Sequence, residues 1–312
     1  MWGDEFVQWC NREPMTLATD PTACLARARR SLDGLSVGDA FGESFMKRLG
    51  DIAARRLSPH PMWRWTDDTA MALAIVDELA ARGDVDEDAL AERFATRYGL
   101  EQWRGYGGTA HEILSAVVAG TPWKLAAGAP FGGTGSKGNG SAMRAAPLGA
   151  YFAHDLDAAI AAARRSARPT HLHPEGAAGA IAVAVAAATV ARMAVGLAPR
   201  DGRALLTTTI EHTPAGVTRE GLIRAAALSL DTDPVVAGAR LGNGALVLCE
   251  DTVPYCLWAA ARHLDDYEAA LWTTLTGLGD VDTTCAIVGG ILAAGDAVIP
   301  PIWLARREPL PA

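Results

Sequence analysis

Two short acidic motifs contain the residue types best suited to chemistry in this chain. The sequence TDDT occupies residues 66–69, and DVDT occupies residues 280–283, near the opposite end of the chain. Together they supply four carboxylates and several hydroxyls, which are hard oxygen ligands that suit Mg²⁺, Mn²⁺ or Ca²⁺ better than zinc. If the fold brings the motifs together, they form a two-metal site.

Each motif also fits an ordinary helix start, because Thr or Asp caps a helix and acids favour its first turn. Thr66 precedes the apolar run Ala70–Val76, and Thr283 precedes Cys285–Val288. Capping accounts for one hydroxyl and one carboxylate in each motif, but it leaves a second acid unexplained in both. Acids this close repel one another unless a cation neutralises them, so we favour the metal-site interpretation.

A glycine-rich stretch, GGTGSKGNGSAMR at residues 132–144, leads directly into an apolar segment. Glycines let the backbone turn tightly and present N–H groups to a phosphate, and a following helix start favours negative charge. The stretch is not a Walker loop, because Lys137 is followed by glycine and not by Ser or Thr. A flexible turn without a ligand is the alternative.

Two further motifs contain candidate polar residues. The pair His171 and His173 lacks a third ligand at zinc-site spacing, so a ligand-contacting or hydrogen-bonding imidazole is favoured over a metal site. GDAFGE at residues 38–43 follows a helical stretch, and turn chemistry accounts for its glycines and for Asp39. This leaves Glu43 available as an acid or base.

Helices must position these motifs, because apolar residues recur at helical spacing and few segments alternate with a period of two. The predicted helical ranges are Cys24–Leu35, Ala70–Ala81, Ala142–Ala150, Ala177–Val195, Gly221–Leu230, Val253–Ala261 and Ile287–Val298. Gly and Pro at residues 59–61, 128–140 and 277–279 mark loops beside the motifs. We therefore predict an all-α fold with functional residues at helix starts and in loops.

Length, charge and cysteine content restrict the class of protein. The 312 residues, half of them hydrophobic, can bury one large core, and no linker divides them, so we expect a single domain over residues 1–312. A net charge of −8 argues against a protein that coats nucleic acid. The residues 177–190 are rich in alanine and fit a buried helix better than a membrane span.

The cysteines and the N-terminus favour a cytoplasmic location. The five cysteines are an odd number without CxxC spacing, which fits a reducing compartment better than a disulfide framework. The N-terminal residues, with Trp2, Asp4 and Glu5, lack the basic and apolar regions of a signal peptide. The cysteines are Cys10, Cys24, Cys249, Cys256 and Cys285.

The order of five motifs resembles the ADP-ribosylglycohydrolase family, which includes the dinitrogenase reductase-activating glycohydrolases. The motifs are GDAFG from residue 38, TDDTAM from 66, GNGSAMRAAPLG from 138, TH from 170 and GDVDT from 279. They occur in family order over about residues 25–300. The resemblance implies a compact, orthogonal multi-helix bundle with two Mg²⁺ or Mn²⁺ ions at the bottom of an ADP-ribose cleft.

The resemblance also implies roles for individual residues. The implied metal ligands are Thr66, Asp67, Asp68, Asp280, Asp282 and Thr283. The residues implied to contact the diphosphate, the adjacent ribose or another part of the substrate are Ser136, Gly138, Asn139, Gly140, Ser141, Met143 and His171. We assign catalytic roles to Glu43, Asp67 and Asp282, in a reaction where a metal-activated water attacks the anomeric carbon and an acid protonates the leaving group.

Two departures from the family pattern concern the acid and the acceptor. Many members have a glutamate four positions after the glycine that ends the first motif, but this chain has Met46 there, with Glu43 as a substitute. Members that act on ADP-ribosyl-arginine often carry an aspartate in a loop that matches residues 104–109, and this chain has none. The sequence therefore does not secure arginine specificity.

Three functional hypotheses follow. The leading one is a monomeric, metal-dependent hydrolase that releases ADP-ribose from a modified protein side chain or another acceptor. The second is a degenerate member that binds ADP-ribose without turnover, because the usual glutamate is displaced. The third is a hydrolase of a small-molecule or nucleic-acid ADP-ribose conjugate.

Overall fold

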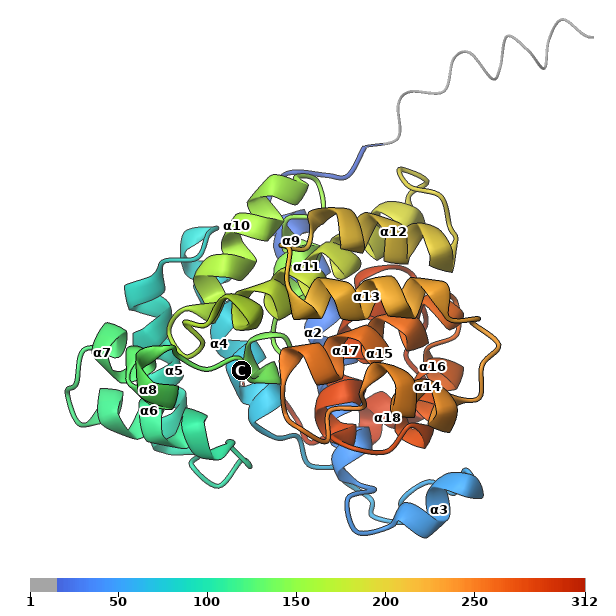
Figure 1. The fold of residues 1–312 in the computed structure, drawn as a ribbon, viewed down its shortest axis with the longest axis horizontal. Coiled ribbons are helices and arrows are strands. Elements are labelled where there is room, and N and C mark those ends of the chain that lie inside the picture. The colour runs from blue at the N-terminus through green and yellow to red at the C-terminus, as the bar shows by residue number, and fades with distance from the viewer. Residues whose placement is uncertain (1–15, 312) are drawn as a thin grey trace, which may run out of the picture.

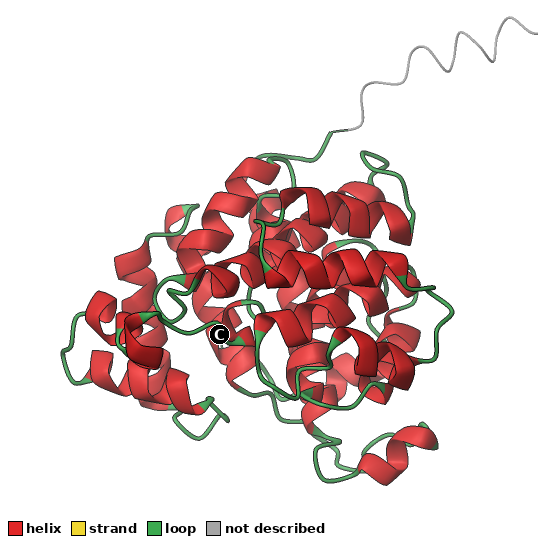
Figure 2. Cartoon of the chain, viewed as in Figure 1, coloured by secondary structure: helices red, strands yellow, loops and turns green. Residues whose placement is uncertain are grey.

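The computed structural model describes residues 16–311, and the regular elements in this part of the chain are helices (Figure 1, Figure 2). The all-α prediction is therefore confirmed. The helices are α2 (Pro21–Glu43), α3 (Leu49–Ala53), α4 (Asp67–Arg82), α5 (Glu87–Leu100), α6 (Gly108–Val118), α7 (Trp123–Gly128), α8 (Pro130–Gly133), η1 (Asn139–Ser141), α9 (Ala146–Tyr151), α10 (Leu156–Ala167), α11 (Pro174–Ala194), α12 (Gly202–His212), α13 (Val217–Ala227), α14 (Pro234–Leu241), α15 (Cys249–Arg262), α16 (Tyr267–Thr276), α17 (Val281–Ala294) and α18 (Pro301–Arg306).

Helix α11 is the buried helix predicted over residues 177–190. It is long and apolar enough to cross a membrane, with a mean hydropathy of 1.7 over an 18-residue window, yet 83% of that window is buried inside the protein. Helices α9, α10, α12, α15 and α17 pack around it. A helix that is apolar on all sides belongs inside a core, so the prediction of a buried helix is confirmed.

Helix α2 continues to Glu43, so the turn expected at residues 38–43 is wrong. Gly38 and Gly42 lie inside this helix, where an added Cβ would overlap a backbone carbonyl oxygen of α17. These glycines therefore allow close approach of two helices and do not turn the chain. Glycine lowers helix propensity, but tertiary packing overrides that preference here.

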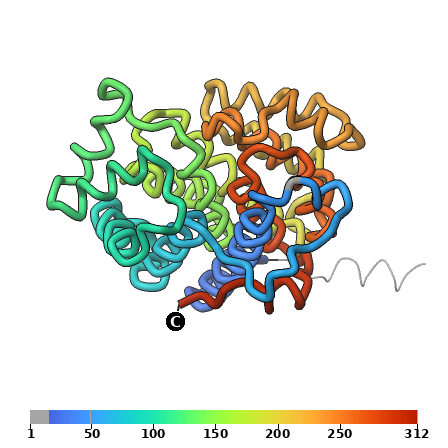
Figure 3. Tube along the Cα trace, turned by 90° about the horizontal axis from the view of Figure 1, so that it is seen from below, coloured from blue at the N-terminus to red at the C-terminus, as the bar shows by residue number. Residues whose placement is uncertain are grey.

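The contact between α2 and α17 brings the two ends of the described chain together. Figure 3 shows the first described helix, in blue, beside the red C-terminal helices. Because Asp39 follows Gly38 on α2, this packing sets its carboxylate near Asp282 in the first turn of α17. A stack of Phe41 on Trp303, with ring centroids 4.4 Å apart, fixes the same end of α2 to α18.

The range predicted as a helix over Ala142–Ala150 is wrong in its first half. The chain forms the short η1, then a turn, and the α-helix begins only at Ala146. Pro147 lies in the first turn of α9, where its missing N–H is tolerated, but it would disrupt a helix continuing from Ala142.

Four of the five cysteines lie within the described residues, and all four are free and buried. Cys10 lies outside the described residues, as do Trp2, Asp4 and Glu5, on which the signal-peptide prediction was based.

Candidate active site

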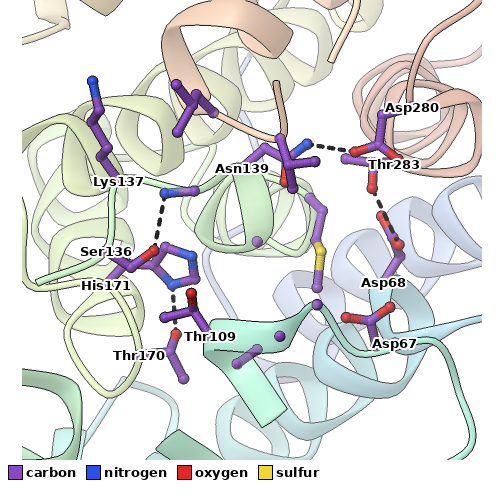
Figure 4. Close-up of a pocket in the computed structure, with 18 of the residues that line it drawn as sticks. Asp67, Asp68, Thr109, Ser136, Lys137, Asn139, Thr170, His171, Asp280 and Thr283 are labelled. Atoms are coloured by element: carbon purple, nitrogen blue, oxygen red, sulfur yellow. Dashed lines mark hydrogen bonds between the residues drawn. The ribbon is translucent and has the colours of Figure 1, made fainter. Parts of the chain in front are cut away.

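A cavity of about 750 Å³ opens between the N-termini of α4 and α17 and the glycine-rich loop before η1. Figure 4 shows Asp67, Asp68, Asp280 and Thr283 at one side of it, and Ser136 near the other side. This volume lies within the usual range for a small-molecule site. The fold therefore places the acidic motifs and the glycine-rich loop in one cavity.

The two acidic motifs contact each other directly. The Thr283 hydroxyl on α17 donates a hydrogen bond to Asp68 Oδ2 on α4 at 3.5 Å. Thr66 also caps α4, since its hydroxyl accepts the N–H of Asp68 at 3.4 Å. The capping interpretation is thus correct for Thr66, and it coexists with a cluster of buried acids that capping does not require.

Asp39 is part of this cluster, and our sequence interpretation assigned it to a turn instead. It is fully buried, and its carboxylate accepts the N–H groups of Thr66 and Thr69 at 2.9 and 3.1 Å. It also accepts the hydroxyls of Thr66 and Thr69 at 2.9 and 2.5 Å. An acid between two glycines in an otherwise apolar stretch was the sequence signal that could have identified it.

The acidic cluster fits a divalent cation. One carboxylate oxygen from each of Asp39, Asp68 and Asp282 lies within 4.8 Å of the others. Asp68 Oδ1 and Asp282 Oδ1 are buried and receive no hydrogen bond from any described residue. Buried carboxylate oxygens without a donor are costly unless a cation binds them, and oxygen-only ligands are those that Mg²⁺ or Mn²⁺ prefers.

The electrostatics of the cluster also favour a bound cation. Burial, with Asp282 adding to it, raises the pKa of Asp280 to about 7. Burial also raises the pKa of Asp39 to about 7, although the hydrogen bond from Thr69 opposes the shift. Burial raises the pKa of Asp68 well above its usual value, with Asp39 and Asp282 as further causes. A cation would favour the ionised form of each acid.

The glycine-rich loop is tied to this cluster by Asn139. Its side-chain amide donates to Asp280 Oδ2 at 2.7 Å and to the Thr252 hydroxyl at 3.1 Å. Both amide hydrogens are used in this way, so only the side-chain carbonyl is free to contact a ligand. Asn139 therefore holds a predicted metal ligand in addition to lining the cavity.

The residues predicted to contact the substrate have two different locations. Six of the seven line the cavity, and Ser141 does not. Ser141 is fully buried, and its hydroxyl donates to the backbone carbonyl of Gly176 at 2.7 Å. Its side chain thus anchors the loop to α11, and a substrate contact by Ser141 stays a prediction. The six lining residues are Ser136, Gly138, Asn139, Gly140, Met143 and His171.

The two histidines of the THLH motif have separate roles. His173 caps α11, where its Nδ1 accepts the N–H of Glu175 at 3.1 Å. His171 is 6% exposed, and burial, together with the positive charge of Arg144, lowers its pKa well below the usual value. The imidazole of His171 is therefore neutral near pH 7.

The position of the predicted acid Glu43 differs from that of Met46. Glu43 is the last residue of α2 and is half-buried, but it is not among the residues that line the cavity. Burial and then Asp282 raise its pKa. Met46 is 50% exposed and does line the cavity. A catalytic role for Glu43 stays a prediction.

Apolar residues that no motif indicated also line the cavity. Phe131, Leu246 and Val247 are each more than half exposed. Phe131 and Val247 have φ angles of 55° and 57°, in the left-handed region that side chains rarely adopt. Strain of this kind often occurs at ligand sites, but it follows from loop packing that the sequence pattern does not reveal.

Comparison with known proteins identifies the relatives of this chain. The model of the family described as ADP-ribosylglycohydrolase matches residues 20–310. The chain is 39% identical to ADP-ribosylhydrolase ARH3 of Homo sapiens over 52% of its own length and 49% of that protein, so the match spans about half of this relative. It is 24% identical to ADP-ribosylarginine hydrolase Tri1 of Pseudomonas putida, over 96% of this chain and 78% of that protein.

The solved structure of an "ADP-ribosylglycohydrolase-related protein complex" contains a chain with a similar fold. The TM-score is 0.65 with 26% sequence identity, and the match covers 91% of this chain and 93% of the other.

Proposed function

This chain belongs to the ADP-ribosylglycohydrolase family, and we propose that it is a metal-dependent hydrolase that releases ADP-ribose from a modified protein side chain. The proposal rests on one observation: an acidic cluster and a glycine-rich loop line the same cavity. Buried acids with unpaired oxygens occupy one side. The glycine-rich loop occupies the other, where no described residue accepts the proton of the Ser136 hydroxyl. A ribose at the acids and a diphosphate at the loop match this arrangement.

In this proposal the acidic motifs hold two Mg²⁺ or Mn²⁺ ions. The ligands are Thr66, Asp67, Asp68, Asp280, Asp282 and Thr283. Bound there, the ions would supply Lewis-acid polarisation of the ribose hydroxyls and of the attacking water. The loop around Gly138 and the imidazole of His171 would hold the diphosphate, which orients the sugar through a part of the substrate that does not react.

We assign the proton transfers to Asp67 and Glu43. Burial, followed by the negative charge of Asp282, raises the pKa of Asp67 well above its usual value. That shift belongs to the protein without a cation, and a bound cation would oppose it. Asp67 lines the cavity, and there it would take a proton from the attacking water. Glu43 would give a proton to the departing acceptor, in a transition state with oxocarbenium character at the anomeric carbon.

The experiment that tests this function measures release of free ADP-ribose from arginine-, serine- and nucleic-acid-linked substrates. Each is assayed with Mg²⁺, with Mn²⁺ and with a chelator. We expect metal-dependent release that Asp280→Ala and Asp282→Ala abolish, while the control Asp231→Ala, an exposed acid outside the cavity, retains it. Release that persists in chelator would contradict the metal-dependent mechanism, and the substrate that reacts would identify the linkage.

A second candidate function is ADP-ribose binding without turnover. It is favoured by Met46, which lines the cavity at the sequence position of the usual family glutamate, while Glu43 does not line it. The variant Glu43→Gln separates the two functions. Loss of turnover with ADP-ribose binding intact supports catalysis, whereas a wild-type protein that binds ADP-ribose but releases none from any substrate supports the binding function.

A further inference from the structure

The imidazole of His171 has one nitrogen in the protein interior and the other in the cavity. Nδ1 lies 2.7 Å from the Thr170 hydroxyl (Figure 4). Nε2 faces the glycine-rich loop, because a Cβ added to Gly138 or Gly140 would lie 3.3 or 3.2 Å from it. Nε2 has no hydrogen-bond partner among the described residues, so it is available to a ligand in the cavity.

The direction of the hydrogen bond to Nδ1 follows from Arg144. The Nη2 of Arg144 donates to the Thr170 hydroxyl at 2.8 Å and to the carbonyl of Ser166 at 2.9 Å. A guanidinium has no acceptor, so the Thr170 oxygen must accept in this contact and its own proton must go elsewhere. Thr170 is fully buried, and Nδ1 of His171 is the acceptor within reach among the described residues. Donation in the opposite direction would leave a buried hydroxyl proton unpaired.

We propose that Arg144 and Thr170 are positioning residues that hold His171 in the tautomer with its proton on Nε2, and so make it a fixed hydrogen-bond donor to the diphosphate. The chain of donation runs from Arg144 through Thr170 to Nδ1. Because Nδ1 accepts, the single proton of the neutral ring is on Nε2. The identity of the ligand group rests on the proposed function, but the tautomer does not.

The surroundings of Arg144 support a role of this kind. The guanidinium is fully buried and has no carboxylate partner among the described residues, and its Nε has no hydrogen bond there. It lies over the ring of Phe94, with Cζ 4.4 Å from the ring centroid, and its Nη1 is 3.3 Å from the sulfur of Met71. A buried charge without an ion pair contributes little to stability. A guanidinium can only donate hydrogen bonds, so it fixes the direction of donation in the groups that follow it.

A second donor beside His171 indicates the kind of ligand. The Ser136 hydroxyl accepts the N–H of Gly138 at 3.1 Å, and no described residue accepts its proton. Both Ser136 and His171 line the cavity. Two unpaired donors next to a glycine-rich loop suit a group made of acceptors, as phosphate oxygens are.

The direct test is the protonation pattern of the His171 ring in the metal-free protein. Histidine is labelled with ¹⁵N, long-range ¹H–¹⁵N spectra are recorded at neutral pH, and the His171 signals are assigned by their absence in His171→Gln. We expect the Nδ1 shift of an unprotonated nitrogen and the Nε2 shift of a protonated one. A protonated Nδ1, two averaged shifts or a doubly protonated ring would each overturn the proposal.

Variants separate positioning from a general structural role. Thr170→Val removes the hydroxyl that links Arg144 to Nδ1 of His171, so the Nδ1 and Nε2 shifts should move toward each other. Binding of ADP-ribose, measured by calorimetry with Mg²⁺, should weaken by about threefold, because a smaller fraction of the protein has the tautomer that donates from Nε2. Thr170→Ser should restore both. The control Thr189→Val, another buried threonine whose hydroxyl bonds within its own helix, should change neither. Unchanged shifts in Thr170→Val would overturn this role of Thr170.

A substitution of Arg144 gives an independent check. Arg144→Gln introduces a side chain that can accept as well as donate, so Thr170 can reverse its direction and the single tautomer should be lost. Circular dichroism establishes that this variant is folded. A folded Arg144→Gln with the wild-type ring shifts would refute the role of Arg144. If wild-type protein shows the expected tautomer but does not bind ADP-ribose, the proposed function and the diphosphate contact fail together, while the fixed tautomer stands.

Discussion

Replacing Asp280 by Asn should stabilise the metal-free protein and weaken its metal binding. Burial and the charge of Asp282 raise the pKa of Asp280 from 3.8 to about 7 in the folded state. Because the folded pKa is the higher one, the folded state binds the extra proton, and stability falls as pH rises from about 4 to about 7. A difference of about three pKa units corresponds to a penalty on the order of 4 kcal/mol above pH 7.

The measurement is urea unfolding of wild type and Asp280→Asn in EDTA, at pH 4 and pH 8, followed by circular dichroism. The variant should match wild type at pH 4 and exceed it at pH 8 by up to about 4 kcal/mol. Saturating Mn²⁺ should reverse the order at pH 8, because a ligand that binds only the folded state stabilises it. The exposed Asp231→Asn is the control and should show neither effect.

One result would refute this reasoning. The difference in free energy of unfolding between Asp280→Asn and wild type in EDTA could be the same at pH 4 and at pH 8. In that case the ionised Asp280 carboxylate does not destabilise the metal-free protein. The cluster would then be stable without a cation, and the main physical argument for a metal site would be lost.

Three further predictions concern the loop, the helix contact and the cavity wall. Asn139→Ala should weaken Mn²⁺ binding by about tenfold in calorimetry, since Asp280 loses its 2.7 Å hydrogen bond; unchanged affinity would contradict the link between loop and cluster. Gly38→Ala should lower the free energy of unfolding by about 3 kcal/mol in urea, because its Cβ overlaps a backbone oxygen of α17, whereas Gly50→Ala, with no atom nearby, should not. Met46→Glu should raise ADP-ribose release by about tenfold if a cavity-lining acid limits turnover; an unchanged rate would show that Met46 is not the limiting difference.

The acidic motifs and the helical class could be predicted from sequence because both are local signals. Thr66 caps a helix whose apolar spacing follows at once, and acids before such a run are visible without knowing the fold. The buried helix α11 has an equally local signal in its continuous apolar composition. Such patterns do not depend on which segments meet in space.

Asp39, Ser141 and Arg144 could not be assigned in this way, because their roles depend on contacts between distant segments. From the sequence alone Asp39 fits a turn, whereas the packing of α2 against α4 and α17 places it in the acidic cluster. From the sequence alone Ser141 belongs to a ligand-binding loop, whereas in the structure its hydroxyl donates to a backbone carbonyl of α11. Arg144 follows the loop directly, yet its function depends on Thr170, which the chain reaches only after α9 and α10.

A short hydrogen-bond network joins the glycine-rich loop to the acidic cluster across the cavity. The N–H of Asn139 donates to the carbonyl of Val247 at 3.1 Å, and the N–H of Asp280 donates to the carbonyl of Asn243 at 3.1 Å. The Asn139 amide closes the network on Asp280 at 2.7 Å. One segment, residues 243–247, therefore contacts both the loop and the acidic motif, and it sets the spacing between them. A loop variant that loses activity must accordingly be tested for metal affinity before the loss is attributed to substrate binding.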